Sequence, residues 1–213
     1  MVPWVVELLI HPENFFSSLD RKKINLWIPG IIVILSGLGS VLPFLPAVFM
    51  MRESASQFMY AIQLIEILPV PVIVWCIYSV LFYFLGRLAA GSGSFELVMQ
   101  NTGYGMLPGT ITSLVMQIFP LVLGGFPVLP VVIVGQTIPQ SLWVTLSIGC
   151  TLIIPLLGIC WNGYLWIAGL SVAHAIPRNV SRKIVAPICI ASALVVAMPL
   201  VFTFLIMTTI PVR

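Results

Sequence analysis

Hydrophobic residues run along this chain in long blocks, separated by short polar or proline-rich segments. Five blocks are each close to the roughly 20 residues that a helix needs to cross the hydrocarbon core of a bilayer. They cover about residues 26–50, 67–85, 107–123, 142–170 and 184–210. The fourth block is longer than a bilayer requires, and Pro155 offers a kink within it. The pattern therefore predicts an all-α integral membrane protein, a bundle of five transmembrane helices.

The segment before the first block, residues 1–23, carries a short amphipathic pattern. Pro12 suits the first position of a helix, and Glu13 follows in the first turn, where a negative charge is favoured. Phe15 and Phe16 then gather on one side. We predict a short cytoplasmic helix lying in the membrane interface, with a loosely ordered tail as the alternative.

Residues 124–140 are apolar but rich in proline and glycine, which makes a regular helix improbable. We expect a loop on the outer surface, and a re-entrant element shielded by the helices is the alternative. Lys and Arg placement supports five spans with a cytoplasmic N-terminus and an outside C-terminus, because cytoplasmic loops are enriched in these residues. The predicted inner residues are Arg21, Lys22, Lys23, Arg87, Arg178, Arg182 and Lys183, and the outer ones are Arg52 and Arg213. A sixth span at 124–140 would spoil this bias.

Composition agrees with a membrane protein. The chain is 60% hydrophobic and only 7% charged, whereas soluble domains carry about 25% charged residues. We therefore expect one membrane domain over residues 1–213, without a nucleic-acid-binding surface. The four cysteines lie in apolar runs without a paired or His-associated spacing, so no metal or cofactor is expected. No hydrolase motif is present, which argues against an enzyme.

The most distinctive local feature lies between the second and third blocks, at residues 91–108. Ser94 is a plausible N-cap, and Glu96 suits the first turn of a short helix. Gly103-Tyr104-Gly105 would end that helix, and Pro108 would begin the next one. We expect an amphipathic hairpin directed toward the inner interface.

Three short motifs resemble the Yip1 domain family, especially its compact prokaryotic branch. They are the lead-in from Leu8-Leu9-Ile10-His11-Pro12 to Phe15-Phe16, the Gly93-Ser94-Phe95 turn with its helix, and the Gly103-Tyr104 to Pro108 element. The resemblance implies five spans and a non-enzymatic role. It also implies that eukaryotic relatives sit in Golgi and ER membranes, bind prenylated small GTPases and associate with one another. The Asp-Leu-Tyr-Gly-Pro element of those relatives is absent here.

Polar residues within or beside the apolar blocks have two readings each. Glu66 stands next to the second block, where it would meet water at the outer interface or form an ion site. Asn162 and Gln117 would hydrogen-bond a neighbouring helix or line a solute path. His174, at the inner end of the fourth block, is expected as a cation at the negative helix terminus, with a ligand or proton-relay role as the alternative.

The function expected from these features is a Yip1-like membrane-organising scaffold or partner-binding protein, placed in a prokaryotic cell membrane. Membrane lipids are the expected partners, together with a second copy or another membrane protein. The candidate contact residues are Arg21, Lys22, Lys23, Gly103, Tyr104, Pro108, Arg178, Arg182 and Lys183. The alternative is a small transporter, channel or lipid-translocating subunit that uses Glu66, Gln117 and Asn162.

Overall fold

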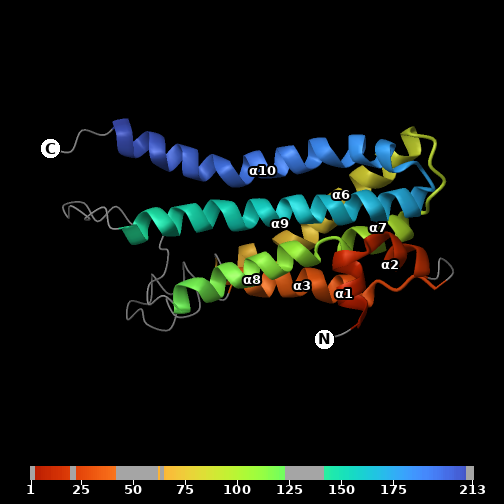
Figure 1. Ribbon diagram of the computed structural model, residues 1–213, viewed down its shortest axis with the longest axis horizontal. Coiled ribbons are helices and arrows are strands. Elements are labelled where there is room, and N and C mark those ends of the chain that lie inside the picture. The colour runs from red at the N-terminus through yellow and green to blue at the C-terminus, as the bar shows by residue number, and fades with distance from the viewer. Residues whose placement is uncertain (1–2, 20–22, 42–61, 63–64, 123–141, 210–213) are drawn as a thin grey trace.

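Long helices lie side by side in an elongated bundle (Figure 1). The computed structural model describes residues 3–19, 23–41, 62, 65–122 and 142–209, and the regular elements within these ranges are all helices. Their bounds are α1 Pro3–Ile10, α2 Pro12–Ser18, α3 Trp27–Val41, α6 Val70–Leu88, α7 Phe95–Tyr104, α8 Leu107–Val122, α9 Leu142–His174 and α10 Arg178–Thr209.

Three helical segments within the described residues are long and apolar enough to cross a membrane. They are Ile65–Leu88, Leu152–His174 and Arg178–Met198. They match the second, fourth and fifth predicted spans, and Pro155 is accommodated inside α9 without ending it. Helices α3 and α8, of 15 and 16 residues, occupy parts of the first and third predicted spans. The all-helical membrane class is confirmed, while the count of five crossings stays a prediction.

Helices α7 and α8 run in line along α9, in the opposite direction. Residues farther along α7 and α8 meet residues progressively earlier in α9. The contacting pairs are Gly93 with His174, Asn101 with Gly169, Thr102 with Trp166, Gly109 with Asn162, and Thr112 with Gly158. Helices α7 and α8 therefore form one line, and its interruption lies beside residues 162–166 of α9.

This arrangement corrects the expectation for residues 91–108. The predicted short helix exists, and Ser94 caps it by accepting a hydrogen bond from the Leu97 N–H at 3.3 Å. However, α7 is packed against α3, α6 and α9, and most of its residues are buried. Its apolar side chains thus contact protein, because a helix surrounded by three others has little surface left for lipid.

Helices α1 and α2 pack on the same end of the bundle. Pro12, Phe15 and Phe16 are buried against the protein, and α2 contacts α9. The outward face of α2 is exposed and polar, and it comprises His11, Glu13, Asn14, Ser17 and Ser18. The helix predicted to start at Pro12 is present, but its Phe side chains pack on protein, where the sequence suggested lipid.

Several expectations fall outside the described residues. These are the second half of the first span (residues 42–50), the segment 124–140, and the side chains of Arg21, Lys22, Arg52 and Arg213.

Candidate functional site: the junction between α7 and α8

The candidate site is the interruption between α7 and α8, which we call the junction (residues 103–109). Helix α7 closes when Gly105 N–H donates to the Asn101 carbonyl at 3.0 Å and Met106 N–H donates to the Gly103 carbonyl at 3.1 Å. Pro108, fully buried in the second position of α8, has no N–H to leave unpaired. The Gly103-Tyr104 to Pro108 motif therefore ends one helix and begins the next.

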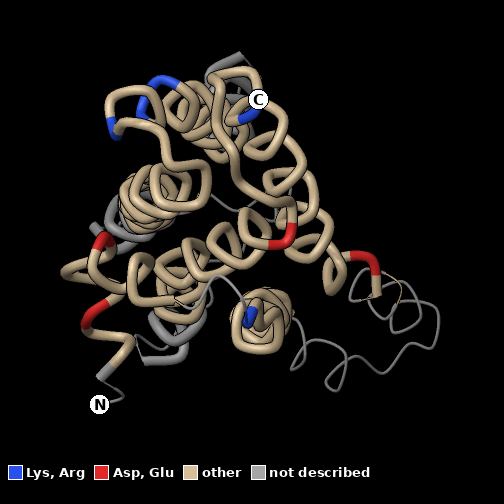
Figure 2. Tube along the Cα trace, turned by 90° about the vertical axis from the view of Figure 1, so that its right-hand side faces the viewer, with Lys and Arg blue, Asp and Glu red and all other residues tan. Residues whose placement is uncertain are grey.

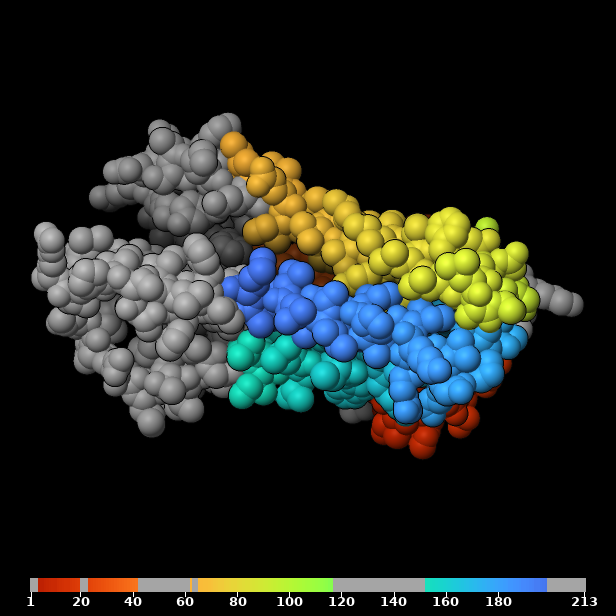
Figure 3. Space-filling view, turned by 90° about the horizontal axis from the view of Figure 1, so that it is seen from above, coloured from red at the N-terminus to blue at the C-terminus, as the bar shows by residue number. Residues whose placement is uncertain are grey.

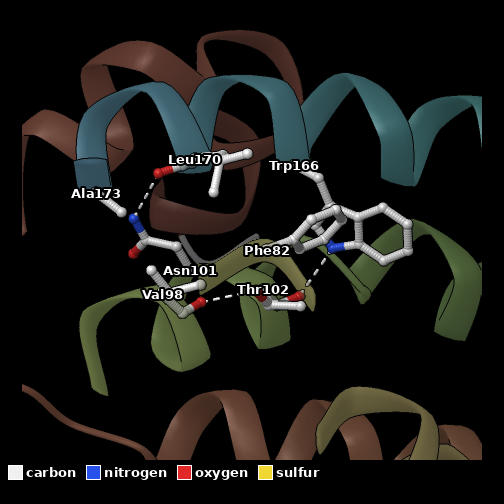
Figure 4. Close-up of a pocket in the computed structure, with 8 residues that line it drawn as sticks. Phe82, Val98, Asn101, Thr102, Trp166, Leu170 and Ala173 are labelled. Atoms are coloured by element: carbon white, nitrogen blue, oxygen red, sulfur yellow. Dashed lines mark hydrogen bonds between the residues drawn. The ribbon is translucent and has the colours of Figure 1, made fainter. Parts of the chain in front are cut away.

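Side chains from neighbouring helices hydrogen-bond the backbone at this interruption. Trp75 Nε1 donates to the Met99 carbonyl at 2.9 Å. Figure 4 shows the second of these bonds, in which Trp166 Nε1 donates to the Thr102 carbonyl at 3.0 Å. On the α8 side, the Gly109 N–H donates to Asn162 Oδ1 at 2.8 Å. A helix end leaves backbone groups unpaired, and burial makes unpaired groups costly. These three side chains therefore stabilise a broken helix in a buried setting.

Glycines let the helices approach closely at the junction. A Cβ added to Gly103 would stand 2.6 Å from the Pro29 Cβ and 2.9 Å from Trp75 Nε1. A Cβ on Gly105 would overlap the Trp166 indole. Both positions need glycine because rigid groups fill the space that a side chain would take.

Tyr104 links the junction to the N-terminal helices. Its side chain is buried, and its ring packs edge-on against Phe15 at 5.1 Å and Trp4 at 6.0 Å between centroids. Burial raises the pKa of the Tyr104 hydroxyl above its usual value. The tyrosine therefore stays neutral and fixes α1 and α2 on the bundle.

His174 holds the other end of α7. The Ser92 N–H donates to its carbonyl at 3.0 Å, and the Gly93 N–H donates to Nδ1 at 3.3 Å. Gly86, Gly91 and Gly93 surround the imidazole so closely that a Cβ on any of them would clash with His174 or its neighbour Ala173. The side chain is only 1% exposed. The expectation of a surface cation is wrong here, because a ring nitrogen that accepts an N–H carries no proton.

A small cavity lies beside the junction, between Phe82, Asn101 and Trp166 (Figure 4). Its volume, about 10 Å³, is at the lower limit for one water molecule. Asn101 Nδ2 donates to the Gly169 carbonyl at 2.9 Å, whereas its buried Oδ1 has no protein partner among the described residues. In this conformation the cavity offers no room for a solute larger than water.

The residues predicted from sequence fall into separate places. Gly103, Tyr104 and Pro108 are buried at the junction, so in this structure they offer no surface to a partner or to lipid. The structure instead gives them a packing role.

The basic residues remain accessible. Arg182, Lys183 and Lys23 are exposed, and Arg178 pairs with Glu13 at 2.6 Å with its guanidinium above the Tyr164 ring at 5.6 Å. Among the described residues, the predicted contact set therefore divides into three buried and four exposed positions, and Arg21 and Lys22 lie outside the described part.

The predicted intramembrane polar residues do not form a shared site in the described contacts. Asn162 is buried and bonds a neighbouring helix, one of its two expected readings. Glu66 is exposed just before α6, and Gln117 lies in α8 with its side chain outside the described part. Sequence reasoning missed Trp75, Trp166 and Asn101. The sequence signal that could have found the two tryptophans was an indole N–H inside an apolar block, because such a donor needs an acceptor. The glycine-rich helix break at residues 103–105 was the part of the chain that could offer one.

The fold and junction define a class: an all-helical membrane protein with an interrupted helix packed inside its bundle. Comparison with known proteins then gives the family. A family profile described as the Yip1 domain matches residues 6–205, and the chain belongs to the Yip1 domain family, a family of non-enzymatic membrane proteins. An uncharacterised protein of Methanocaldococcus jannaschii is 25% identical over 118 residues, covering 52% of this chain and 84% of that protein. No solved structure matches the chain significantly.

Proposed function

We propose that this protein is a non-enzymatic membrane scaffold that presents a packed layer of helices at the cytoplasmic membrane surface. This inner layer consists of α1, α2, α7, and the parts of α9 and α10 that flank residues 175–177. It contacts lipid headgroups and partner proteins, while five helices cross the bilayer.

The observation that carries this proposal is the way the inner layer is built. Tyr104 fixes α1 and α2 to the end of α7, and His174 fixes its beginning. The outward side of α2 is polar, and the start of α10 exposes Arg182 and Lys183. A rigid layer with a polar outer surface is suited to binding, because its contact groups are already ordered.

Charge supports a cytoplasmic inner layer. Within the described residues, Lys and Arg lie near helix ends and in the connection before α3. Figure 2 looks along the bundle from the end where α2 lies and shows these positions in blue. Arg87 lies in the last turn of α6. The first two turns of α10 carry Arg178, Arg182 and Lys183. The positive-inside rule assigns such an end to the cytoplasm.

Cysteine labelling in intact cells tests this topology. Three variants are made in a protein without its four native cysteines, and each carries one new cysteine, at Ser92, Asn179 or Val212. We expect a membrane-impermeant reagent to label only Val212→Cys, with all three labelled after permeabilisation. Labelling of Asn179→Cys from outside would overturn both the topology and the cytoplasmic layer.

One observation favours the second candidate, a small transporter or lipid-translocating subunit. A helix interrupted deep in the bundle is a common feature of transporter sites. Here the interruption is filled by Trp75, Trp166 and Asn162, which favours the scaffold. Solute uptake or lipid scrambling in proteoliposomes, lost in Asn162→Leu and kept in Tyr164→Phe, would reverse this preference.

A further inference from the structure

We propose that the cytoplasmic membrane surface meets this bundle obliquely. On the side of α2 the hydrocarbon ends near Tyr164, whereas along α6 it continues almost to Leu88. The partner that this surface fits is the lipid bilayer itself. The inference rests on membership in a membrane protein family and not on the scaffold role.

Exposed aromatic residues mark the boundary on the first side. Trp27 is 80% exposed, and Trp161 and Tyr164 are each 40% exposed. Trp161 and Tyr164 lie within one turn of each other on α9, beside Asn162, which bonds Gly109. Trp27 lies nearer the α2 end, since Pro29, two residues after it, meets Gly103, about 9 Å before Gly109. Trp and Tyr concentrate where hydrocarbon meets headgroups. The exposed Trp161 and Tyr164 therefore mark the end of the hydrocarbon on this side of the bundle.

The surface beyond this height is polar on the α2 side. Glu13, Asn14 and Ser17 face outward from α2, which lies alongside the last turns of α9 (Figure 1). Tyr164 precedes the end of α9 by about 15 Å, at 1.5 Å per residue. Burying these polar groups in lipid would be costly, so α2 lies outside the hydrocarbon.

The α6 side is different at the same height. Val80, Leu81, Phe84 and Leu88 are all exposed, and Leu88 reaches 83%. Gly86 packs on His174, which places Leu88 level with the end of α9 and hence with α2. An exposed apolar strip of this length calls for lipid or protein cover.

The two sides lie on opposite edges of the molecule. Figure 3 shows α6 in yellow along one edge and the N-terminal helices in red at the other, with α9 and α10 between them. A membrane surface that is tilted relative to the bundle axis can meet the α2 edge near Tyr164 and the α6 edge near Leu88, so it fits both edges. On α10, between the edges, the long side chains of Arg182 and Lys183 can reach the headgroups from an intermediate depth.

Helix lengths agree with a tilted bundle. Residues 142–164 of α9 and 187–209 of α10 each extend about 35 Å, slightly more than the roughly 30 Å of hydrocarbon. A helix of about 35 Å fits a 30 Å core when it is tilted by about 30°, within the usual range for membrane helices.

Depth measurement with fluorescent labels tests the proposal in lipid nanodiscs. Leu88→Cys and Ser17→Cys lie on opposite edges of the bundle, and both lie beyond the level of Tyr164, since Gly86 meets His174 and Phe16 meets Gly169. Each is made in a background without native cysteines, labelled with bimane, and exposed to lipid carrying a nitroxide near the headgroup. We expect at least threefold stronger quenching at Leu88→Cys than at Ser17→Cys, with Leu157→Cys as the control inside the hydrocarbon.

Equal weak quenching at both positions would overturn the proposal in favour of a flat boundary at Tyr164. Equal strong quenching would overturn it in favour of a flat boundary at Leu88. Oxidative footprinting of the wild-type protein gives a readout that needs no cysteine replacement. There, Phe84 and Leu88 should be protected in nanodiscs while His11 is modified, and modification of all three would contradict the oblique boundary.

Discussion

At the scale of single residues, glycine identity at the junction follows from what stands against each position. Gly103 faces the Pro29 ring and the Trp75 indole, whereas Gly30, one residue after Pro29, has nothing within 4 Å of an added Cβ. We expect Gly103→Ala to lower stability by about 1–3 kcal/mol, the usual effect of overpacking a core. The matched change Gly30→Ala should be neutral or slightly stabilising, as replacing glycine within a helix generally is. Thermal unfolding in detergent distinguishes them, and equal effects would contradict the close packing.

A second residue-scale prediction concerns acid sensitivity at His174. Its Nδ1 accepts the Gly93 N–H, and protonation would replace that acceptor with a donor. The titratable and charged groups recorded near the imidazole are Tyr83 and Arg87, and neither offers a negative charge. Acidification should therefore release the loop 89–94.

Hydrogen exchange measures this release. After correction for intrinsic rates, the peptide containing Ser92 and Gly93 should lose protection as pH falls from about 7.5 to 4.5. In His174→Gln the pH dependence should disappear, and His11→Gln serves as the matched control because His11 is exposed. Unchanged protection in the wild-type protein over this range would show that the ring nitrogen does not hold the loop.

At the scale of elements, the capping of α8 from another helix yields the third prediction. Asn162→Leu keeps the side-chain size but leaves the partly buried Gly109 N–H without its acceptor. The expected loss is about 0.6–2 kcal/mol, the range for hydrogen bonds between membrane helices. Asn14→Leu is the matched control, because Asn14 is exposed on α2 and its side chain makes no described hydrogen bond. Retained stability in Asn162→Leu would mean that water replaces the amide.

Elements were more predictable than their packing. The start of α2 at Pro12, the Ser94 cap and the end of α7 at Gly105 follow from local chemistry that acts within a few residues. The burial of α7 depends on Trp75 and Trp166, which stand far away in sequence. An apolar helix face is equally compatible with lipid and with protein, so sequence alone could not tell that Phe15 and Phe16 pack inward.

At the scale of the whole molecule, the same ambiguity limits what sequence reveals about the membrane boundary. The sequence showed that the fourth apolar block is longer than a bilayer requires, but it did not show what the extra turns of α9 contact. Its last turns carry the packed inner layer, since Gly169 and His174 both bond α7 or the turn before it. The predicted contact residues are also separated in the structure. Lys23, Arg178, Arg182 and Lys183 are exposed, while Gly103, Tyr104 and Pro108 of the family motif are buried.

The accessible basic residues give the last prediction. Arg182 and Lys183 are exposed and have no described ion pair, whereas Arg178 is engaged by Glu13. Each free charge near an anionic surface contributes about 1 kcal/mol. Replacing Arg182 and Lys183 with Gln should therefore weaken retention of anionic phospholipid by roughly 10–30-fold, which corresponds to about 2 kcal/mol. Arg178→Gln alone should have a smaller effect because its charge is already partly compensated.

Lipid retention measured in mixed micelles at low and at high salt tests this, since screening should abolish the difference. If the double variant keeps anionic lipid as firmly as the wild-type protein, the start of α10 is not a headgroup contact, and the scaffold would have to bind the membrane through its apolar helices alone.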